Sequence, residues 1–320
     1  MSVLVTGSIA IDQIMVFQDR FGNHILPHEI HTLNVSFLVP TLEKRWGGTG
    51  ANIAYNLRVL GIDPILLATV GSDFGSYAAW MDRHGLRRNW IRILDDCFTS
   101  QCFITTDLDN NQITSFHPGA MERAHEARLE EVDEEYGVGI VAPTGKHAML
   151  EYARGLKQKG VPCVVDPGQG LPMFEAGELL EMIEGAAIYV VNDYEWALTR
   201  QKTGLDEDAI AERVGAIIYT RGGEGSVVRR GSGNAQVTLS HERSEIPVVR
   251  AEQVVDPTGC GDAYRAGILY AVLKGLPLET GARMGSLLGS IKVAHAGPQS
   301  IEMDLPSFRE RFRREFGDSF

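Results

Sequence analysis

The sequence lacks several features that would assign it to other classes of protein. No apolar run is long enough to cross a bilayer, although 44% of the residues are hydrophobic. No cluster of basic residues stands out and the formal net charge is −12, which argues against binding to a nucleic-acid backbone. The stretch from Met1 to Gly7 has neither the basic region nor the long apolar core of a secretory signal. We therefore expect a cytoplasmic protein with a sizeable core, without a membrane or nucleic-acid partner.

Cysteine spacing and glycine patterns argue against further classes of site. The four cysteines lack the spacing of metal ligands, so reduced thiols are expected. Gly7 follows a strand-like apolar piece but is not followed by the glycines of a dinucleotide fingerprint, which disfavours a dehydrogenase of the Rossmann type. No glycine turn is followed by Gly-Lys-Ser or Gly-Lys-Thr, so a Walker loop is absent from the sequence.

Short strand-like pieces alternate with helical patterns along most of the chain. The apolar pieces cover residues 3–5, 65–71, 139–142, 163–166, 187–191 and 216–220, and helical periodicity covers 51–61, 74–84, 149–159, 261–274, 278–295 and 308–316. This alternation predicts an α/β fold with a mostly parallel, helix-covered sheet. The length of 320 residues allows one large α/β domain or two smaller ones.

Two segments interrupt the alternation. Residues 13–45 contain β-prone pieces at 13–17 and 33–39 with no helix pattern, and residues 97–118 contain a hairpin signal with strands at 102–106 and 112–116. We expect these segments to pair into a small β-sheet that acts as a flap or lid.

The most informative stretch runs from Asp256 to Asp262, between an apolar piece and a helical pattern. Gly259 and Gly261 let the backbone approach an anion, and the amides of a first helical turn point toward it. A carboxylate inside such a site, Asp262, is useful if it receives the proton of a reacting hydroxyl. Taken alone, the stretch is equally compatible with a glycine turn in which Asp262 caps a helix.

A second glycine-rich stretch surrounds the expected start of an earlier helix. Gly47, Gly48 and Gly50 exceed what a helix cap needs, and Asn52 lies one turn into the helix. Backbone amides and the Asn52 side chain could therefore contact a ligand. Asp12 follows the first strand, near the edge where open parallel sheets bind ligands.

Two further motifs follow predicted strands. Asn192 and Glu195 have the spacing of a capping box, and in an acidic protein they could also hold a hydrated Mg²⁺. Thr220, Gly222 and Gly225 belong to a strand–turn–strand in which a nucleotide could lie against the backbone, or which is an ordinary hairpin.

The four motifs, in this order, resemble the phosphofructokinase-B (ribokinase-like) family of sugar and nucleoside kinases. Within it, the segment from Gly261 to Gly267 is most similar to bacterial adenosine and nucleoside kinases. The resemblance spans nearly the whole chain. It implies a three-layer α/β/α fold with a β lid, formed by residues 1–320 as one kinase domain. It also implies Mg²⁺-dependent transfer of the ATP γ-phosphate to a primary hydroxyl.

The resemblance also implies roles for single residues. Asp262 would be the general base, and the amides of Gly259, Cys260 and Gly261 would stabilise the transferring phosphoryl group. Substrate hydroxyls would be bound by Asp12, Gly48 and Asn52, hydrated Mg²⁺ by Asn192 and Glu195, ATP by Thr220, Gly222 and Gly225, and a K⁺ ion by Asp256 and Thr258. We add Gly47 and Phe116 as expected substrate contacts.

Pro257 and Cys260 depart from the residues common in the family, and both keep the backbone shape of the turn. Exposure of Cys260 would make the enzyme sensitive to thiol reagents. Arg265 could reach phosphate or lie on the surface.

Lid aromatics favour a nucleoside over a free sugar, because a base needs flat apolar walls. The lid segments contain Phe17, Phe37, Phe103 and Phe116, which could provide such walls or could form the core of the lid itself. Sugar phosphorylation and a catalytically silent binding protein are the alternatives, and intact Asp262 argues against the second. A second subunit could cover an exposed lid edge, giving a homodimer.

Overall fold

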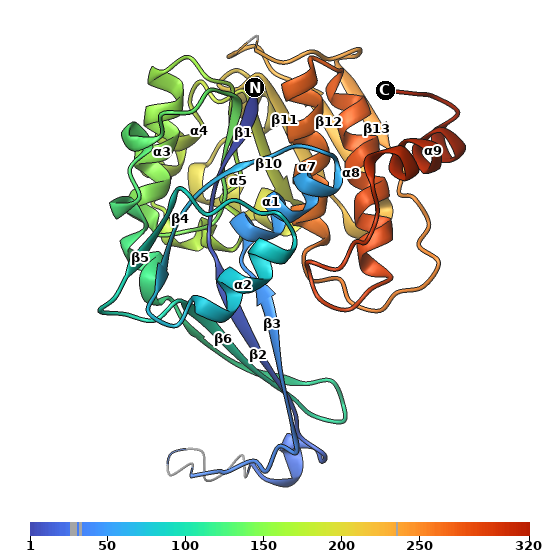
Figure 1. Ribbon diagram of the computed structural model, residues 1–320. Coiled ribbons are helices and arrows are strands. Elements are labelled where there is room, and N and C mark those ends of the chain that lie inside the picture. The colour runs from blue at the N-terminus through green and yellow to red at the C-terminus, as the bar shows by residue number, and fades with distance from the viewer. Residues whose placement is uncertain (26–30, 32–33, 235) are drawn as a thin grey trace.

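The computed structural model describes residues 1–25, 31, 34–234 and 236–320. Within these residues nine strands form a large sheet in the order β13-β12-β11-β10-β9-β8-β1-β4-β5 (Figure 1). The strands are β1 (Ser2–Thr6), β4 (Ile65–Gly71), β5 (Ile91–Leu94), β8 (Tyr136–Val141), β9 (Cys163–Val165), β10 (Ile188–Asn192), β11 (Ala216–Thr220), β12 (Ser226–Arg230) and β13 (Arg243–Ile246). Neighbours from β5 to β11 are parallel, and β12 is antiparallel to both of its neighbours.

Helices cover both faces of this sheet (Figure 1). One layer contains α1 (Thr49–Val59), α2 (Gly75–Arg83), α7 (Cys260–Lys274), α8 (Leu278–Val293) and α9 (Leu305–Phe316), and the other contains α3 (Lys146–Gln158), α4 (Ala176–Ile183), α5 (Asp193–Thr203) and α6 (Glu207–Ala211). Successive strand residues point to opposite faces, so Val3 and Val5 join the first core and Leu4 joins the second. The three-layer α/β/α prediction is confirmed.

A small sheet projects from the body of the molecule at the lower end in Figure 1. It contains β2 (Ala10–Val16), β3 (Thr41–Gly47), β6 (Ser100–Thr106) and β7 (Gln112–His117), paired in the order β3-β2-β6-β7. The expected strand at 33–39 is wrong for residues 34–39, and Leu33 lies outside the described residues. The strand in this region is β3, which starts at Thr41. Its residues pair one to one with those of β2, from Thr41 opposite Val16 to Gly47 opposite Ala10.

Several short elements carry no strong periodic signal and were not expected. They include strands β5 and β13 and the 3₁₀ segments η1 (Phe21–Asn23), η3 (Gly119–Glu126), η4 (Leu129–Glu131), η5 (Gly168–Met173) and η6 (Gly222–Glu224). Within the described part of the chain, none of the helices combines the length and the apolar composition of a transmembrane span.

Close helix packing fixes the position of α7. A Cβ added to Gly267 would lie 2.4 Å from the nitrogen of Gly285 in α8. Any side chain at Gly267 would therefore separate the two helices. The first turn of α7, which carries Asp262, is held at a defined distance from α8.

Candidate active site

Most of the predicted site residues gather at the carboxyl edge of the large sheet, whereas Asp12 and Phe116 lie on β2 and β7 of the small sheet. Asn192 and Thr220 are partners at the ends of β10 and β11. Asp166 follows β9 directly, and α7 begins at Cys260. Ligands bind along this edge in open parallel sheets, so the motifs meet where the fold favours a site.

The turn before α7 has the backbone of an anion-binding loop. Gly259 has φ of +82°, and a Cβ there would lie 2.5 Å from the Cβ of Pro298, so no other residue fits without strain. The amide of Thr258 donates to Asp256 Oδ1 at 2.9 Å, and the amide of Cys260 donates to the carbonyl of Pro257 at 3.2 Å. Gly261 is exposed. The turn is thus closed by its own hydrogen bonds while its surface remains accessible to an anion.

Asp262 is held by Asn52 from the other glycine motif. Asn52 Nδ2 donates a 2.8 Å hydrogen bond to Asp262 Oδ2. Burial raises the pKa of Asp262 to about 7; Asn52 and Arg265 oppose this increase, and the charge of Asp166 adds to it. A carboxylate with a pKa near neutrality can accept a proton from a reacting hydroxyl.

Gln299 connects Asn52 to the helix layer, a contact that sequence reasoning missed. Gln299 Nε2 donates to Asn52 Oδ1 at 3.0 Å and to the hydroxyl of Tyr77 at 2.5 Å. Its Oε1 accepts from Trp80 Nε1 at 2.9 Å, and Tyr77 donates to the carbonyl of Gly47 at 2.8 Å. Gln299 therefore fixes the amide of Asn52 in the orientation that donates to Asp262.

Arg265 is buried, so the surface position considered for it is wrong. Its Nε and Nη2 donate to the two carboxylate oxygens of Asp166 at 2.9 and 3.3 Å. The two side chains are only 7% and 5% exposed. This ion pair joins α7 to the end of β9, and the charges of both residues affect the pKa of Asp262.

Asp12 lies on β2 beside the first glycine of the second motif. A Cβ added to Gly47 would be 2.9 Å from Asp12 Oδ2, so Gly47 leaves room for this carboxylate. Burial raises the pKa of Asp12 to about 6; Arg45 lowers it and Asp256 raises it. Arg45, which is the β3 partner of Asp12, also donates to Asp256 Oδ2 at 3.1 Å. A carboxylate in these surroundings is a suitable acceptor for substrate hydroxyls.

Gly48 supports the same corner through its backbone. Its φ is +92°, and an added Cβ would lie 2.5 Å from both the nitrogen of Ala10 and the carbonyl oxygen of Ser8. The start of α1 therefore lies against the link between β1 and β2. This contact brings Asn52 and Asp12 to the same end of the sheet.

Phe116 shares a face of the small sheet with Asp12. Asp12 pairs with Cys102, and Cys102 pairs with Phe116. Directly paired residues point to one side of a sheet. Burial raises the pKa of Cys102 and the charge of Asp12 adds to this increase, as expected for neighbours on one face. Phe116 is 52% exposed. These paired residues, Arg45, Asp12, Cys102 and Phe116, form a row across the sheet, called here the Asp12 row. The row presents a carboxylate and an aromatic ring on the same face.

The other lid phenylalanines do not share that row. Phe103 is adjacent to Cys102 on β6 and so points to the opposite face. Phe17, Phe21 and Phe37 pack together, with ring centroids 4.8 to 5.8 Å apart. Of the four lid phenylalanines, Phe116 is therefore the one that lies in the Asp12 row, because strand alternation and local packing direct the other three rings elsewhere.

Asn192 and Glu195 form the capping box of α5. Asn192 Oδ1 accepts from the amide of Glu195 at 2.7 Å, and Glu195 Oε2 accepts from the amide of Asn192 at 2.8 Å. Burial and the charge of Asp166 raise the pKa of Glu195. In the described parts of the chain, no group of three or more His, Cys, Asp or Glu side chains could hold a metal by itself. The local excess of negative charge nevertheless fits a hydrated Mg²⁺ that takes its remaining ligands from phosphates.

The glycine turn after β11 is the expected strand–turn–strand. Thr220 pairs with Ser226 across β11 and β12, and Gly222 and Gly225 have φ of +53° and +85°. Ser226 Oγ and the Tyr264 hydroxyl share a 2.7 Å hydrogen bond. This bond joins the start of β12 to α7. It therefore fixes the position of the Gly222–Gly225 turn relative to the turn at Gly259.

Cys260 is not activated as a nucleophile. Its Sγ donates to the carbonyl of Gly289 at 3.6 Å, and the residue is half-buried. Burial raises its pKa, Lys292 lowers it, and Asp256 and Asp262 raise it. A raised pKa keeps the thiol protonated, so the structure gives no support for selective reactivity.

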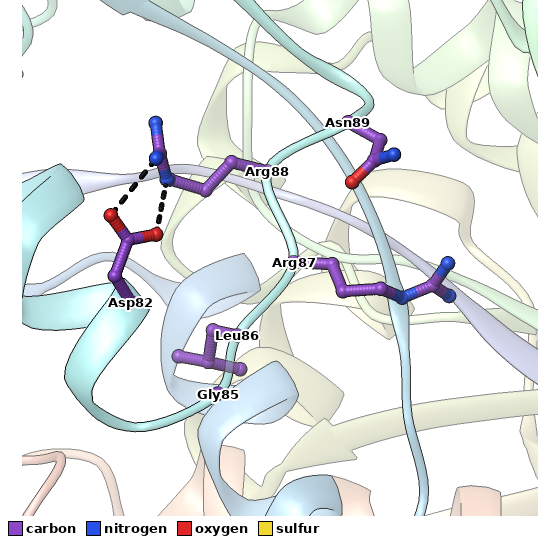
Figure 2. Close-up of a pocket in the computed structure, with 6 residues that line it drawn as sticks. All are labelled: Asp82, Gly85, Leu86, Arg87, Arg88 and Asn89. Atoms are coloured by element: carbon purple, nitrogen blue, oxygen red, sulfur yellow. Dashed lines mark hydrogen bonds and ion pairs between the residues drawn. The ribbon is translucent and has the colours of Figure 1, made fainter.

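A surface depression lies away from these residues, between α2 and β5 (Figure 2). Figure 2 shows Arg88 paired with Asp82 along one side of it. Arg87 is paired with Asp63 and Glu134, which precede β4 and β8. The depression is therefore at the amino edge of the parallel strands, opposite the candidate site, and its arginines are already neutralised.

Comparisons with known proteins identify the family of this chain. The sequence model described as pfkB family carbohydrate kinase matches residues 2–304. A nucleoside kinase of Methanocaldococcus jannaschii is 33% identical over 270 residues, which is 83% of this chain and 85% of the relative. A nucleoside kinase of Methanothermobacter thermautotrophicus is 29% identical and covers 96% of this chain and 97% of its own.

Solved structures agree with the sequence matches. The Burkholderia thailandensis nucleoside kinase in complex with inosine is 44% identical, with a TM-score of 0.86 and coverage of 99% of both chains. The same enzyme in complex with ADP-inosine is 45% identical, with a TM-score of 0.84 over 99% of this chain and 97% of the other. Because the family model and a relative above 30% identity both cover most of the sequence, the chain belongs to the pfkB family of carbohydrate kinases and is an ATP-dependent kinase whose acceptor is a hydroxyl group.

Proposed function

We propose that this kinase transfers the γ-phosphate of ATP to the 5′-hydroxyl of a nucleoside such as adenosine. The observation that carries the proposal is the cross-strand row in which Asp12 and Phe116 share one face of the small sheet. A nucleoside needs an acceptor for ribose hydroxyls and a flat apolar contact for its base, and this row supplies both. The nucleoside kinases among the relatives support the same acceptor.

The chemistry follows from the contacts of Asp262. The 5′-oxygen attacks the γ-phosphorus, the bond from that phosphorus to the β–γ bridging oxygen breaks, and the hydroxyl proton passes to Asp262. The amides of Gly259, Cys260 and Gly261 would stabilise charge on the transferring group, although the Cys260 amide would first leave its 3.2 Å hydrogen bond to Pro257. Because the transition state is loose, proton transfer comes late and positioning contributes most of the rate.

Substrate orientation is assigned to α1 and the lid. Asn52 would contact the acceptor hydroxyl while donating to Asp262, and Asp12 would accept from the other ribose hydroxyls. Gly47 and Gly48 would let the sugar approach the backbone. Closure of the lid, assigned to residues 13–45 and 97–118 of a single domain over 1–320, would exclude water.

Nucleotide and metal are assigned to the ends of β10 and β11. Thr220, Gly222 and Gly225 would line the ATP cleft. Asn192 and Glu195 would hold hydrated Mg²⁺, which when bound supplies positive charge to the β- and γ-phosphates. The carboxylate of Glu195, buried near Asp166, favours a cation in this position.

The test is ADP release with Mg–ATP across adenosine, inosine, guanosine, cytidine, ribose and fructose. Turnover with nucleosides and not with free sugars supports the proposal. Turnover with free sugars alone would keep the roles proposed for Asp262 and for the turn at Gly259 and Gly261, but the acceptor would be a sugar and not a nucleoside. No turnover with any acceptor, together with ATP binding, would indicate a silent binding protein instead.

We further propose that two copies associate through the lid. The face opposite the Asp12 row exposes Leu42, Phe103 and Ile113, which are 67%, 40% and 42% exposed. A second lid would bury these side chains and the free edges of the small sheet. Light scattering on the purified protein should give twice the mass of 35.1 kDa, and the monomer mass would exclude the dimer.

A further inference from the structure

A fully buried lysine lies beneath the anion-binding turn. Lys292, in the last turn of α8, is 0% exposed. Its Nζ donates to the carbonyl of Asp256 at 2.6 Å and to the carbonyl of His295 at 3.1 Å, and it lies 3.9 Å from Asp256 Oδ2. Burying an ammonium group is costly unless it is paired, and these three oxygens compensate the charge.

Two of the three oxygens around Lys292, the carbonyl oxygen and Oδ2 of Asp256, belong to the turn itself. The amides of Val255 and Asp256 donate to the carbonyl of Val293 at 2.8 and 3.1 Å, so the start of the turn is tied to the end of α8. The Asp256 carboxylate accepts from the amides of Thr258 and Gly297 at 2.9 and 2.8 Å. The ammonium group therefore lies on the inner side of the turn that precedes Gly259.

This arrangement does not fit a free monovalent cation. The resemblance implies a K⁺ ion held by Asp256 and Thr258 together with backbone carbonyls. A K⁺ ion needs several oxygens, largely carbonyls, as direct ligands. The carbonyl of Asp256 already accepts from Lys292 Nζ at 2.6 Å, a distance that leaves no room for an ion between them.

We propose that the ammonium group of Lys292 takes the place of the monovalent cation, so that this kinase works without K⁺. The covalently attached charge supports the turn as an ion would, and its presence does not depend on salt concentration. The inference rests on the phosphoryl transfer proposed at Asp262, because only there does a charge beneath the turn affect the rate.

The first test uses the unmodified protein. ADP release with Mg–ATP and the preferred acceptor is measured in choline chloride and in KCl of equal ionic strength. We expect the same kcat in both salts and the same unfolding temperature. A kcat or unfolding temperature that rises with KCl but not with choline would overturn the inference. Absence of turnover in either salt contradicts the proposed function instead, and the unfolding temperature then still tests whether K⁺ binds.

The second test removes the ammonium group. Lys292→Ala should lower kcat in choline chloride about 10- to 100-fold with a smaller effect on KM, because the charge stabilises the transferring phosphoryl group. KCl or NH₄Cl should then raise both kcat and the unfolding temperature of the variant, since the vacated oxygens can bind an ion. Lys159→Met, which removes an exposed lysine at the end of α3, is the matched control and should behave as the unmodified protein.

Two results would contradict this second expectation. Lys292→Ala with unchanged kcat in choline chloride would show that the buried charge does not support catalysis. A slow variant whose rate and unfolding temperature ignore K⁺ and NH₄⁺ would show that the oxygens around Lys292 do not form a cation site. The salt comparison on the unmodified protein decides the matter where the variant does not fold.

Discussion

Asn52 and Asp262 lie 210 positions apart in the chain, and the side-chain amide of Asn52 donates a 2.8 Å hydrogen bond to the Asp262 carboxylate. This contact joins the first turn of α1 to the first turn of α7. It combines the two glycine motifs into one site. The amide also stabilises the ionised form of a carboxylate whose pKa burial raises.

The first prediction concerns the proposed base. Asp262→Asn keeps the size of the side chain but cannot accept a proton. We expect kcat to fall by roughly 10²–10⁴, the scale of a general base, with affinities for ATP and acceptor retained. Steady-state kinetics and calorimetric titration of each ligand measure the two effects. An unchanged kcat would remove Asp262 from the mechanism.

The second prediction is the pH dependence of the reaction. A general base must be ionised, and the pKa of Asp262 is about 7. We expect kcat/KM to rise as the pH increases through about 7, with Asp12 contributing near pH 6 if its ionised form binds hydroxyls. Initial rates between pH 5 and 9 measure this profile. A rate that is flat across this range would contradict the assignment.

The second prediction has a counterpart in stability, because a pKa of about 7 means that ionisation of Asp262 lowers the stability of the folded state. Its folded pKa of about 7 exceeds the ordinary value of 3.8, so between these values the unfolded chain holds fewer protons and stability falls as the pH rises. Asp262→Asn lacks this effect. The unfolding temperature of the variant relative to the unmodified protein should therefore increase from pH 5 to pH 8.

The third prediction tests Gln299 as a positioning residue. Gln299→Leu leaves Asn52 Oδ1 without its 3.0 Å donor, so the Asn52 amide can rotate away from Asp262. We expect kcat to fall about tenfold, which corresponds to about 1.4 kcal/mol. The pH profile should also move to higher pH, because Asn52 lowers the pKa of Asp262. A purely structural role would lower stability without moving the profile.

Sequence patterns predicted the parts of this molecule that depend on local order. The alternation of strand-like apolar pieces with helical patterns predicted the layered fold. The glycines near Asn52 and Asp262 predicted the two loops that precede α1 and α7. The contact of Gln299 with Asn52 has no such pattern, because a buried glutamine carries no periodic signal and its partner is 247 positions away. Lys292 was missed for the same reason, since the helical pattern around it says nothing about the carbonyls beneath it.

The lid shows the same limit from another direction. β-propensity located the hairpin of β6 and β7 but predicted a strand at 33–39. The described residues of that range, 34–39, form no strand, and β3 follows them at Thr41–Gly47. Which phenylalanine faces Asp12 depends on register, and a shift of one residue exchanges the faces. Composition alone could count Phe103 and Phe116 together, whereas pairing separates them.

The fourth prediction concerns the buried ion pair behind the site. Arg265→Met leaves the Asp166 carboxylate buried without its partner, and we expect a loss of about 3–5 kcal/mol in the free energy of unfolding. Replacing both residues, as Arg265→Met with Asp166→Leu, should recover most of that loss. Urea denaturation of the two single variants and the double variant measures the coupling. Additive losses would show that the two charges do not stabilise each other.

The last prediction separates a nucleoside acceptor from a sugar and has a control one residue away from the row. Phe116→Ala removes the ring that shares a face with Asp12. We expect KM for the nucleoside to rise about tenfold or more, because a base–aromatic contact is worth about 1–3 kcal/mol.

Phe103→Ala is the matched control, since Phe103 is a half-exposed phenylalanine on the opposite face of the same sheet. Its loss should leave KM unchanged and instead weaken association of two lids in light scattering. If both variants raise KM equally, the effect comes from lid stability and not from contact with a base. If neither does, the base lies outside the Asp12 row, and the preference for a nucleoside loses the observation on which it rests.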